Sequence, residues 1–586
     1  MKKPQQPGSY CAGWSKVEMR VEPRGHAMHG YGGMNENRAW GSRTPLFARA
    51  LVVSDASGGN LIYCCLDLGV ISYATRHEIL LAVSTEMGGA LNEETAIITC
   101  THTHSAPGGL TYDAYYNLPT PGFQRETLSQ VVQAASQAIL SAWRDQKEVT
   151  LFTSEGAFAD DVPVAWNRAL DAYNRNGDVV KRPDSLAHLA INRTMYLLWV
   201  EYEGRVAALV SLFGVHATCI GNSGRQYCGD NKGFASAFTE AALAAQGIEK
   251  PIAIFAQTTA GDVSPHYRGP GERARRARLA GEAEYEYAEQ NGRLQSEHAL
   301  DLISGKNRRQ ITGTIDGCLT YADFSQRKAA PCYADGAAEA ETFEPCIGAS
   351  MLAGKALDGA GIAPAVEAIA RTAAETVRGI RLSMKRTYTP EERAYVERLY
   401  RAQGKKDIVI EGNHKLAFGL PLAKLPLPEF ADPLIAQIKQ QARSGAIDKS
   451  AMLPYVLPLQ IVKMGDTAIV AAPGEFTTQA GYRLIDTIKE ALQPAGIRHV
   501  FMNSYSNDYM GYVTTHEEYD QQTYEGGHNL YGKWTLAVFQ TEYEKLSREF
   551  IKPPAERHYD REMRPPMPPA EELALRSNLT ATVARR

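Results

Sequence analysis

The sequence predicts an α/β fold of mixed β-sheets flanked by helices, built as one large domain with loop-rich insertions. Two observations predict it. Short β-favouring runs alternate along the chain with longer segments in which apolar residues recur every three or four positions. Apolar residues also make up 44% of the 586 residues, the ordinary range for a globular protein with a sizeable buried core.

The first predicted elements lie in the N-terminal quarter. Two β-favouring runs around a glycine-containing turn predict a hairpin from Leu46 to Leu68. Ala74 to Met87 has the apolar spacing of a helix, and Thr95 to Thr99 predicts the next strand. Glu126 to Trp143 then predicts a long amphipathic helix.

Four later β-rich runs end in a small or polar turn. They are Ala207–Val215, Pro251–Gln257, Thr467–Pro473 and His499–Tyr505. A residue capable of chemistry follows each of them closely. Loops that leave strand ends are held rigidly and often carry reactive groups, so these exits predict one shared pocket.

Two segments depart from this pattern. Ser304 to Gly361 is rich in glycine and alanine and predicts a loop-rich insertion. After Phe550 the chain is too rich in proline for a core, which predicts an extended surface tail followed by a short helix. We therefore divide the chain into a domain of residues 10–550 and a tail of residues 551–586.

Composition excludes several classes of function. The 62 basic and 66 acidic residues give a net charge of -4, so we expect no nucleic-acid partner. No run reaches the roughly 18 apolar residues of a membrane span, and the opening MKKPQQPGSYCAGWSK lacks the apolar centre of a secretory signal. Nine scattered cysteines without a CxxC pair predict reduced thiols. We expect a cytoplasmic protein, or a secreted one only if a leader has been removed.

The motif THTHSAPGG places His102 and His104 directly after a predicted strand. Side chains two positions apart on a strand point to the same side, so both imidazoles are expected to face one cavity. One ring could then bind a metal while the other transfers a proton. The alternative is a pair of surface histidines at a strand end.

Other candidates also have two interpretations. His216 is either a hydrogen-bonded core residue or one of the three or four ligands that zinc requires. Glu475 follows Pro-Gly and is either a carboxylate ligand or a glutamate favoured by the dipole of a helix. The tyrosines between residues 505 and 524 either pack or provide a phenol for a metal or an oxyanion. Ser264 lies outside any G-x-S-x-G motif and is either a helix N-cap or a site residue.

Taken in order, these segments resemble the catalytic domain of the neutral, non-lysosomal ceramidases, from roughly Tyr10 to Glu549. The motifs that carry the resemblance include GYGG (Gly30 to Gly33), THTHSAPGG, FAQTTAGDVSPH, LPLQIVKMGDTAIVAAPGEFTTQAG and NDYMGYVTTHEEYDQQTYEGG. The resemblance implies zinc-dependent hydrolysis of the amide bond of ceramide-like N-acyl sphingoid lipids to a fatty acid and a sphingoid base.

The resemblance also implies a set of zinc ligands, and from it we derive a hypothesis for the role of each remaining candidate. The implied zinc ligands are His102, His216, Glu475 and Tyr512. His104 would exchange protons with water and with the leaving amine. Tyr524 and Arg168, which follows Asn167 in an Asn-Arg pair, would hold the oxyanion, and Ser264 would bind the amide or a substrate hydroxyl. A covalent acyl-serine route stays open.

The chain departs from the family pattern in several places. Thr259 and His266 stand where we expect asparagines, and Ala106 replaces a glycine. We also expect no immunoglobulin-like module of the usual kind after the tail. Two alternatives therefore remain. One is a zinc amidase acting on another N-acyl amide, such as an N-acyl amino acid or a short-chain amide. The other is a non-catalytic lipid-binding or metal-binding protein on the same scaffold. The expected partner is a lipid or N-acyl amide substrate, with transient contact to a membrane surface, and the oligomeric state is left open.

Overall fold

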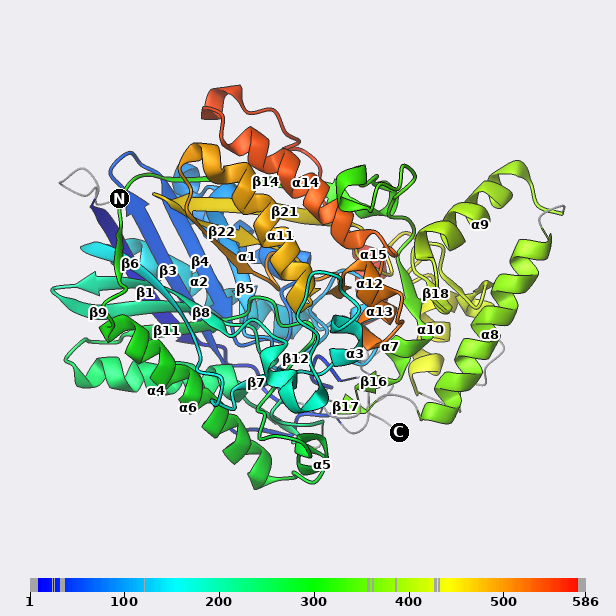
Figure 1. The fold of residues 1–586 in the computed structure, drawn as a ribbon, viewed down its shortest axis with the longest axis horizontal. Coiled ribbons are helices and arrows are strands. Elements are labelled where there is room, and N and C mark those ends of the chain that lie inside the picture. The colour runs from blue at the N-terminus through cyan, green and yellow to red at the C-terminus, as the bar shows by residue number, and fades with distance from the viewer. Residues whose placement is uncertain are drawn as a thin grey trace.

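The computed structural model describes residues 9–577, apart from residues 24, 26, 32–36, 121, 223, 356–358, 361–362, 385–386, 426–428 and 430–432. Gly32 and Gly33 of the GYGG motif and tail residues 578–586 therefore lie outside the described residues. Within them, mixed sheets are flanked by helices, which confirms the predicted fold class (Figure 1).

The largest sheet within the described residues has nine strands, eight of which follow the order β11, β9, β8, β6, β1, β3, β4, β5, while β13 pairs with β6. Pairing is mostly antiparallel, but β11 runs parallel to β9 and β4 runs parallel to β5. The strands are β1 (Tyr10–Glu18), β3 (Phe47–Asp55), β4 (Asn60–Leu66), β5 (Ala96–Cys100), β6 (Lys147–Ala157), β8 (Thr194–Tyr202), β9 (Arg205–Leu212), β11 (Ile252–Ala256) and β13 (Arg309–Ile311). The predicted hairpin is confirmed as β3 and β4.

A second sheet packs face to face against the first. Its strand order is β14 (Ile315–Asp323), β21 (Val456–Met464), β22 (Thr467–Ala471) and β24 (His499–Asn503). Alternate residues of a strand point to opposite faces, so most strands of the large sheet contribute to two buried layers. Leu51, Tyr63 and Leu198 of the large sheet share one buried cluster with Val462 and Phe501 of the second sheet.

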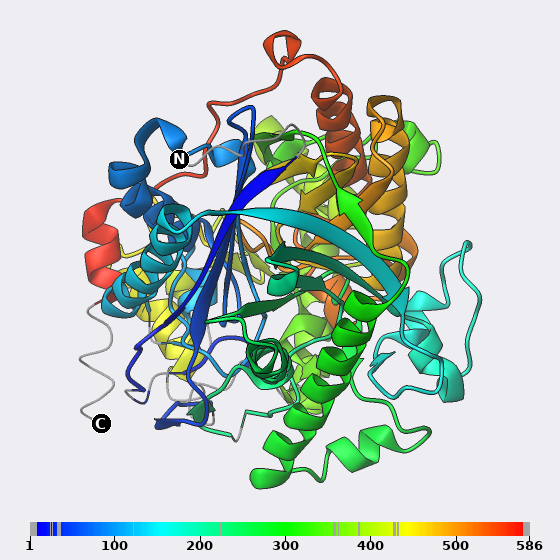
Figure 2. The same ribbon diagram turned by 90° about the vertical axis from the view of Figure 1, so that its left-hand side faces the viewer.

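Helices cover the outer faces of both sheets. On the large sheet, α1 (Tyr73–Met87) and α2 (Arg125–Arg144) cover one half, and α4 (Asp230–Ala245) and α6 (Glu282–Ser304) cover the other. The second sheet is covered by α11 (Thr478–Leu492) and α14 (Thr535–Phe550). Figure 2 shows the blue helices α1 and α2 and the orange helices α11 and α14 on opposite sides of the strands. The two sheets are thus enclosed between helices, and both predicted helices of the N-terminal quarter are confirmed as α1 and α2.

The predicted extent of the loop-rich insertion is wrong in one part. Residues 315–323 form β14, which pairs with β21 along its whole length in the second sheet. Its glycine has a packing reason, because a Cβ at Gly317 would lie 2.3 Å from the carbonyl oxygen of Glu94. A glycine-rich and cysteine-containing composition therefore concealed a buried strand.

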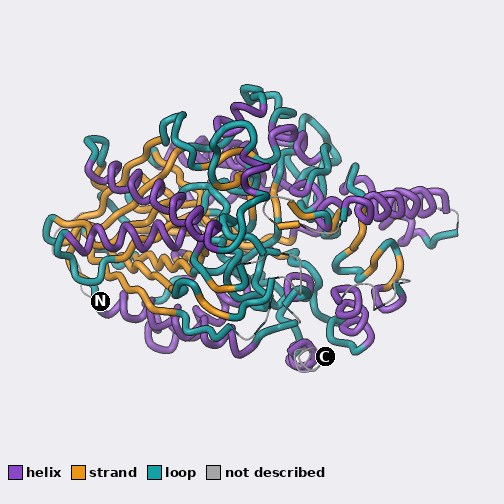
Figure 3. Tube along the Cα trace, turned by 90° about the horizontal axis from the view of Figure 1, so that it is seen from below, coloured by secondary structure: helices purple, strands orange, loops and turns teal. Residues whose placement is uncertain are grey.

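A smaller unit projects from the body (Figures 1 and 3). It contains α8 (Pro364–Ser383), α9 (Pro390–Gln403) and α10 (Pro433–Arg443), together with the sheet of β15 (Cys346–Gly348), β18 (Ile408–Glu411), β19 (Leu416–Ala417) and β20 (Leu420–Pro421). Other short elements are β2 (Gly41–Ser42), α3 (Leu170–Tyr173), β10 (Gln226–Tyr227), α5 (Glu272–Arg276), α7 (Ala349–Leu352), β16 (Gly354–Lys355), β17 (Gly359–Ala360) and α12 (His516–Tyr519).

The chain after α14 lies along the surface of the body. Arg557 pairs with Asp316, and Arg561 pairs with Glu94 at 2.9 Å. The last described element is α15 (Ala570–Ser577). The division of the chain at residue 550 stays a prediction. No described helix combines the length and hydropathy of a membrane span.

Candidate metal centre and active site

The predicted site residues meet where strands of both sheets end. β5 ends at Cys100, just before His102 and His104, and β9 ends at Leu212, just before His216. After β22 the chain forms β23 (Glu475–Phe476), which pairs in parallel with β25 (Tyr512–Val513). The register of this pair sets Glu475 beside Tyr512. Two short parallel strands thus join a carboxylate and a phenol that are distant in the sequence.

The two histidines of the HxH motif do not lie on a strand, so this part of the sequence interpretation is wrong. His102 follows the end of β5 and adopts a φ of 64°, a left-handed conformation that is uncommon for a residue with a side chain. Thr103 forms an isolated bridge with Ala217. A strained loop, rather than strand alternation, brings the two rings together, with their centroids 4.7 Å apart.

His102 and His216 are both oriented by backbone carbonyls. Nδ1 of His102 lies 2.5 Å from the carbonyl oxygen of Gly69, and Nδ1 of His216 lies 2.7 Å from that of Ala260. A ring nitrogen that faces a carbonyl carries the proton, which leaves Nε2 of each ring as a lone-pair donor. Oε2 of Glu475 lies 3.0 Å from Nε2 of His216 and 3.6 Å from Nε2 of His102.

Tyr512 completes this group of atoms. Its hydroxyl lies 3.4 Å from Nε2 of His216. His102, His216, Glu475 and Tyr512 are each no more than 2% exposed, so water does not compete freely for their polar atoms. The structure therefore brings the four predicted ligands into one buried cluster.

His104 lies at the edge of the same cluster. Its Nε2 is 3.2 Å from Nε2 of His102, and its Nδ1 has no hydrogen-bond partner within the described residues. The ligand atoms of His102, His104 and His216 all lie within 4.8 Å of one another. The geometry thus permits His104 to act either as a third histidine ligand or as a free imidazole beside the ligands.

Burial governs the charges in the cluster. Desolvation lowers the pKa of His104 well below its ordinary value and also lowers that of His216, which favours neutral imidazoles. Burial alone would raise the pKa of Glu475, but His102 and His216 reverse this and hold its pKa well below the ordinary range. Desolvation and the neighbouring Glu475 raise the pKa of Tyr512 well above its ordinary value.

This donor set fits a zinc ion. Zinc binds imidazole nitrogen and carboxylate oxygen, and histidine ligands almost always donate their other N–H to a carbonyl or carboxylate. His102 and His216 both show that pattern. The fit rests on the chemistry of the donors and on the fixed orientation of the two rings.

Arg168 approaches the cluster from a different pair of strands. It follows β7 (Ala165–Asn167), which pairs with β12 (Val263–Pro265). Its Nη2 donates to the hydroxyl of Tyr512 at 2.9 Å and to the carbonyl of Gly261 at 3.0 Å. Its Nε pairs with Glu525 at 3.2 Å. A buried carboxylate therefore fixes the guanidinium beside the hydroxyl of Tyr512.

The last two predicted residues flank this arrangement. Ser264 lies on β12 opposite Trp166, so it is not a helix N-cap, and it is 2% exposed. The carbonyl of its neighbour Val263 accepts a hydrogen bond from the backbone N–H of His216 at 3.1 Å. Tyr524, half-buried, opens α13 (Tyr524–Gly527), and its ring centroid lies 5.4 Å from that of Tyr512.

Several side chains of the site were not predicted. Tyr505 and Tyr509 both donate to Glu475, and Glu525 holds Arg168. Outside this group, Nε2 of His528 lies 3.0 Å from the hydroxyl of Tyr116. The density of tyrosines between residues 505 and 524 was a signal for the first pair, but spacing alone could not show which phenols reach the carboxylate.

The residues that depart from the family pattern have other contacts. Nε2 of His266 lies 2.6 Å from the carbonyl oxygen of Tyr287, and its ring packs on that tyrosine. The side chain of Thr259 lies against Gly481 of α11. Neither contact involves the cluster of candidate ligands.

Fold and site together define a class of protein. A buried set of nitrogen and oxygen donors that could hold a metal ion, with an arginine at a strand end beside it, is an arrangement suited to a hydrolase. A family model described as neutral/alkaline non-lysosomal ceramidase, N-terminal, matches residues 10–412 and 440–541. The chain belongs to this family, as its motifs predicted.

Individual relatives agree with the family match. The neutral ceramidase of Pseudomonas aeruginosa is 30% identical over 538 residues, which cover 91% of this chain and 70% of the relative. That of Mycobacterium tuberculosis is 28% identical over 530 residues, covering 88% and 73%. The crystal structure of the Pseudomonas aeruginosa neutral ceramidase matches with a TM-score of 0.72 at 27% identity, covering 93% of this chain and 75% of that one. A structure described as ceramidase complexed with C2 matches with the same TM-score at 28% identity and with the same coverage.

Proposed function

We propose that this chain hydrolyses the amide bond of ceramide-like N-acyl sphingoid lipids with zinc held by His102, His216, Glu475 and Tyr512. One observation carries the proposal: two lone-pair imidazole nitrogens, a carboxylate oxygen and a phenol converge in one buried cluster. The family supports the reaction class, since the relatives are named neutral ceramidases and one solved structure is described as complexed with C2.

Bound zinc would supply Lewis acidity to a water molecule and to the amide carbonyl. His104 would accept a proton at Nε2, the ring nitrogen that faces His102, and would later return it to the leaving amine. Burial lowers the pKa of His104 well below its ordinary value, so the imidazole is neutral and has a lone pair that can accept a proton.

Arg168 and Tyr524 would stabilise the negative charge that develops on the amide oxygen. The guanidinium is already oriented by Glu525 and Gly261, so it needs no rearrangement when the charge appears. Tyr524 is only half-buried and can meet a substrate that enters from solvent. Ser264 would bind the amide or a hydroxyl of the substrate.

Metal analysis coupled to a fatty-acid release assay tests the proposal. We expect wild-type protein to bind one equivalent of zinc, to release fatty acid from an N-acylsphingosine, and to lose and regain activity on chelation and zinc addition. His102→Ala should lose both zinc and activity. His558→Ala, an exposed histidine of the tail, should keep both. Full activity in zinc-free His102→Ala protein would reject the mechanism.

The same assay decides the substrate class. We would measure kcat/KM for N-acylsphingosine, N-acyl amino acids and short-chain amides. The comparison distinguishes a ceramidase from a zinc amidase of another specificity. We expect the N-acylsphingosine to be preferred. A higher kcat/KM for the other amides would replace the lipid substrate while keeping the metal site.

A further inference from the structure

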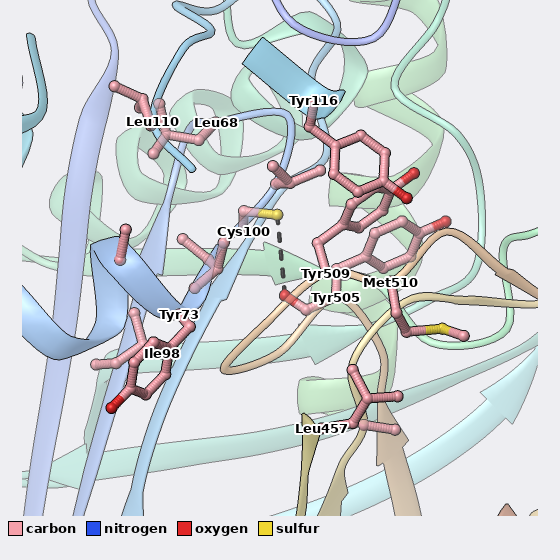
Figure 4. Packing of buried hydrophobic residues seen from close by; sticks show 14 of the residues in the cluster. Leu68, Tyr73, Ile98, Cys100, Leu110, Tyr116, Leu457, Tyr505, Tyr509 and Met510 are labelled. Atoms are coloured by element: carbon pink, nitrogen blue, oxygen red, sulfur yellow. Dashed lines mark hydrogen bonds between the residues drawn. The ribbon is translucent and has the colours of Figure 1, made fainter. Parts of the chain in front are cut away.

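Both carboxylate oxygens of Glu475 receive a hydrogen bond from a phenol. The hydroxyl of Tyr509 donates to Oε1 at 2.6 Å, and the hydroxyl of Tyr505 donates to Oε2 at 3.1 Å. Tyr505 is fully buried and Tyr509 is 5% exposed. Figure 4 shows the hydroxyl ends of Tyr505, Tyr509 and Tyr116 gathered on the same side, away from Cys100.

The loop that carries the two phenols is tightly fixed. Asn507, with a left-handed φ of 66°, accepts hydrogen bonds from the backbone of Ile98 and from Arg76, both at 3.1 Å. Asp508 accepts the backbone N–H groups of Tyr73 and Tyr509, both at 2.8 Å. A loop anchored to β5 and α1 in this way sets both rings before any ligand binds.

The two oxygens of Glu475 therefore have different surroundings. Oε2 faces the imidazoles, at 3.0 Å from Nε2 of His216. Oε1 is covered by the phenol of Tyr509. A carboxylate has about four lone-pair positions, and a short hydrogen bond from a phenol occupies one of them and fixes the rotation of the group.

We propose that Tyr505 and Tyr509 are positioning residues that hold Glu475 so that it offers Oε2 alone to the metal. This inference rests on the proposed zinc site and names the residues that decide how its carboxylate ligand binds. Partners of metal ligands typically change metal affinity by about 10-fold to 100-fold when they are removed. The two phenols should therefore affect zinc affinity even though neither is a ligand.

Zinc affinity, measured on metal-free protein by competition with a chromogenic chelator, tests the inference. We expect Tyr509→Phe and Tyr505→Phe each to weaken zinc binding by about 10-fold and the double variant to weaken it further. Tyr116→Phe is the matched control, since its ring lies 5.0 Å from that of Tyr509 but its hydroxyl contacts His528 instead of Glu475. It should bind zinc as wild type does.

If Tyr509→Phe, Tyr505→Phe and the double variant all bind zinc as tightly as wild type, the inference is overturned while the proposed function stays intact. Absence of zinc binding by the wild type would overturn both. A crystal structure of zinc-loaded wild type gives a second test that needs no variant. We expect one Glu475 oxygen at about 2.0–2.2 Å from the metal and the other still on Tyr509, whereas two oxygens at that distance would overturn the inference.

Discussion

At the scale of single residues, Arg168 uses several of its N–H groups at once. It contacts Glu525 through Nε, and Tyr512 and Gly261 through Nη2. A lysine has one compact ammonium group and cannot reproduce this planar fork. A lysine at this position would keep the charge but lose the fixed directions of these contacts.

We predict that Arg168→Lys lowers kcat/KM by about 100-fold, the range expected when one oriented donor to a developing oxyanion is lost. Steady-state hydrolysis of an N-acylsphingosine measures the effect. Arg483→Lys makes the same chemical change at a partly exposed arginine that pairs with Asp178 and Glu517, and it should stay near wild type. Equal kcat/KM in Arg168→Lys and wild type would exclude an oxyanion role.

His104 allows a sharper distinction, because its Nε2 lies 3.2 Å from that of His102 and could serve either a metal or a proton. We predict that His104→Ala lowers kcat by about 100-fold or more while the protein keeps its zinc. His216→Ala should lose zinc in the same metal analysis. Loss of zinc from His104→Ala would instead make His104 a member of a three-histidine ligand set.

At the scale of local elements, Gly30 and Tyr31 lie against the ring of His104. Gly30 has a φ of 106°, and a Cβ there would lie 2.4 Å from Nδ1 of His104. The ring of Tyr31 also packs edge-to-face against the His104 ring, with the two centroids 4.8 Å apart. Glycine is thus required here both by the backbone conformation and by the imidazole that it touches.

We predict that Gly30→Ala reduces kcat by about 10-fold or more, because the added methyl group must displace His104 from its position. Gly58→Ala is the matched control, since Gly58 has a similar φ of 101° but a Cβ there would meet nothing within 4 Å. Both variants share the cost of a positive φ, so thermal unfolding of Gly58→Ala measures that cost, and any further loss of stability in Gly30→Ala comes from the contact with His104. If Gly30→Ala and Gly58→Ala have equal kcat, the contact with Gly30 does not hold His104 in its catalytic position.

The same scale shows what the sequence can predict. Strands and helices with clear apolar periodicity, such as β3, β4, α1 and α2, are visible locally because side-chain spacing directly reflects their geometry. β14 was missed because its burial depends on β21, more than a hundred residues away, and not on its own composition. The predicted ligands were reached from motifs, whereas the bonds from Tyr505 and Tyr509 to Glu475 depend on loop folding that no local pattern encodes.

At the scale of the whole molecule, the projecting unit is joined to the site through a buried lysine. Lys406 lies between α9 and β18 and is 1% exposed. Its Nζ donates to the carbonyl of Cys346 at 3.0 Å and to that of Asn529, beside His528, at 2.6 Å. Within the described residues no carboxylate forms an ion pair with it. Lys406 thus links Cys346 of the projecting unit to Asn529 of the body, and its positive charge is balanced there by carbonyl groups.

Because Lys406 is buried, the free energy of unfolding should depend on pH. Desolvation lowers the pKa of Lys406 from 10.5 to about 7. Between pH 7 and 10.5 the unfolded chain binds a proton that the folded chain has released, so stability rises with pH across this window. The buried lysine therefore destabilises the fold most below pH 7, and this effect fades as the pH approaches 10.5, the ordinary pKa of lysine.

We predict that, between pH 6 and pH 10, wild type gains roughly 4 kcal/mol of unfolding free energy relative to Lys406→Met, which carries no titrating group at this position. Urea unfolding of both proteins across this range measures the difference, in which the titration of other groups cancels. Lys545→Met, which removes an exposed lysine of α14, should instead parallel wild type. If the curves of wild type and Lys406→Met run parallel, Lys406 keeps its proton in the folded state, and the joint tolerates a full buried charge.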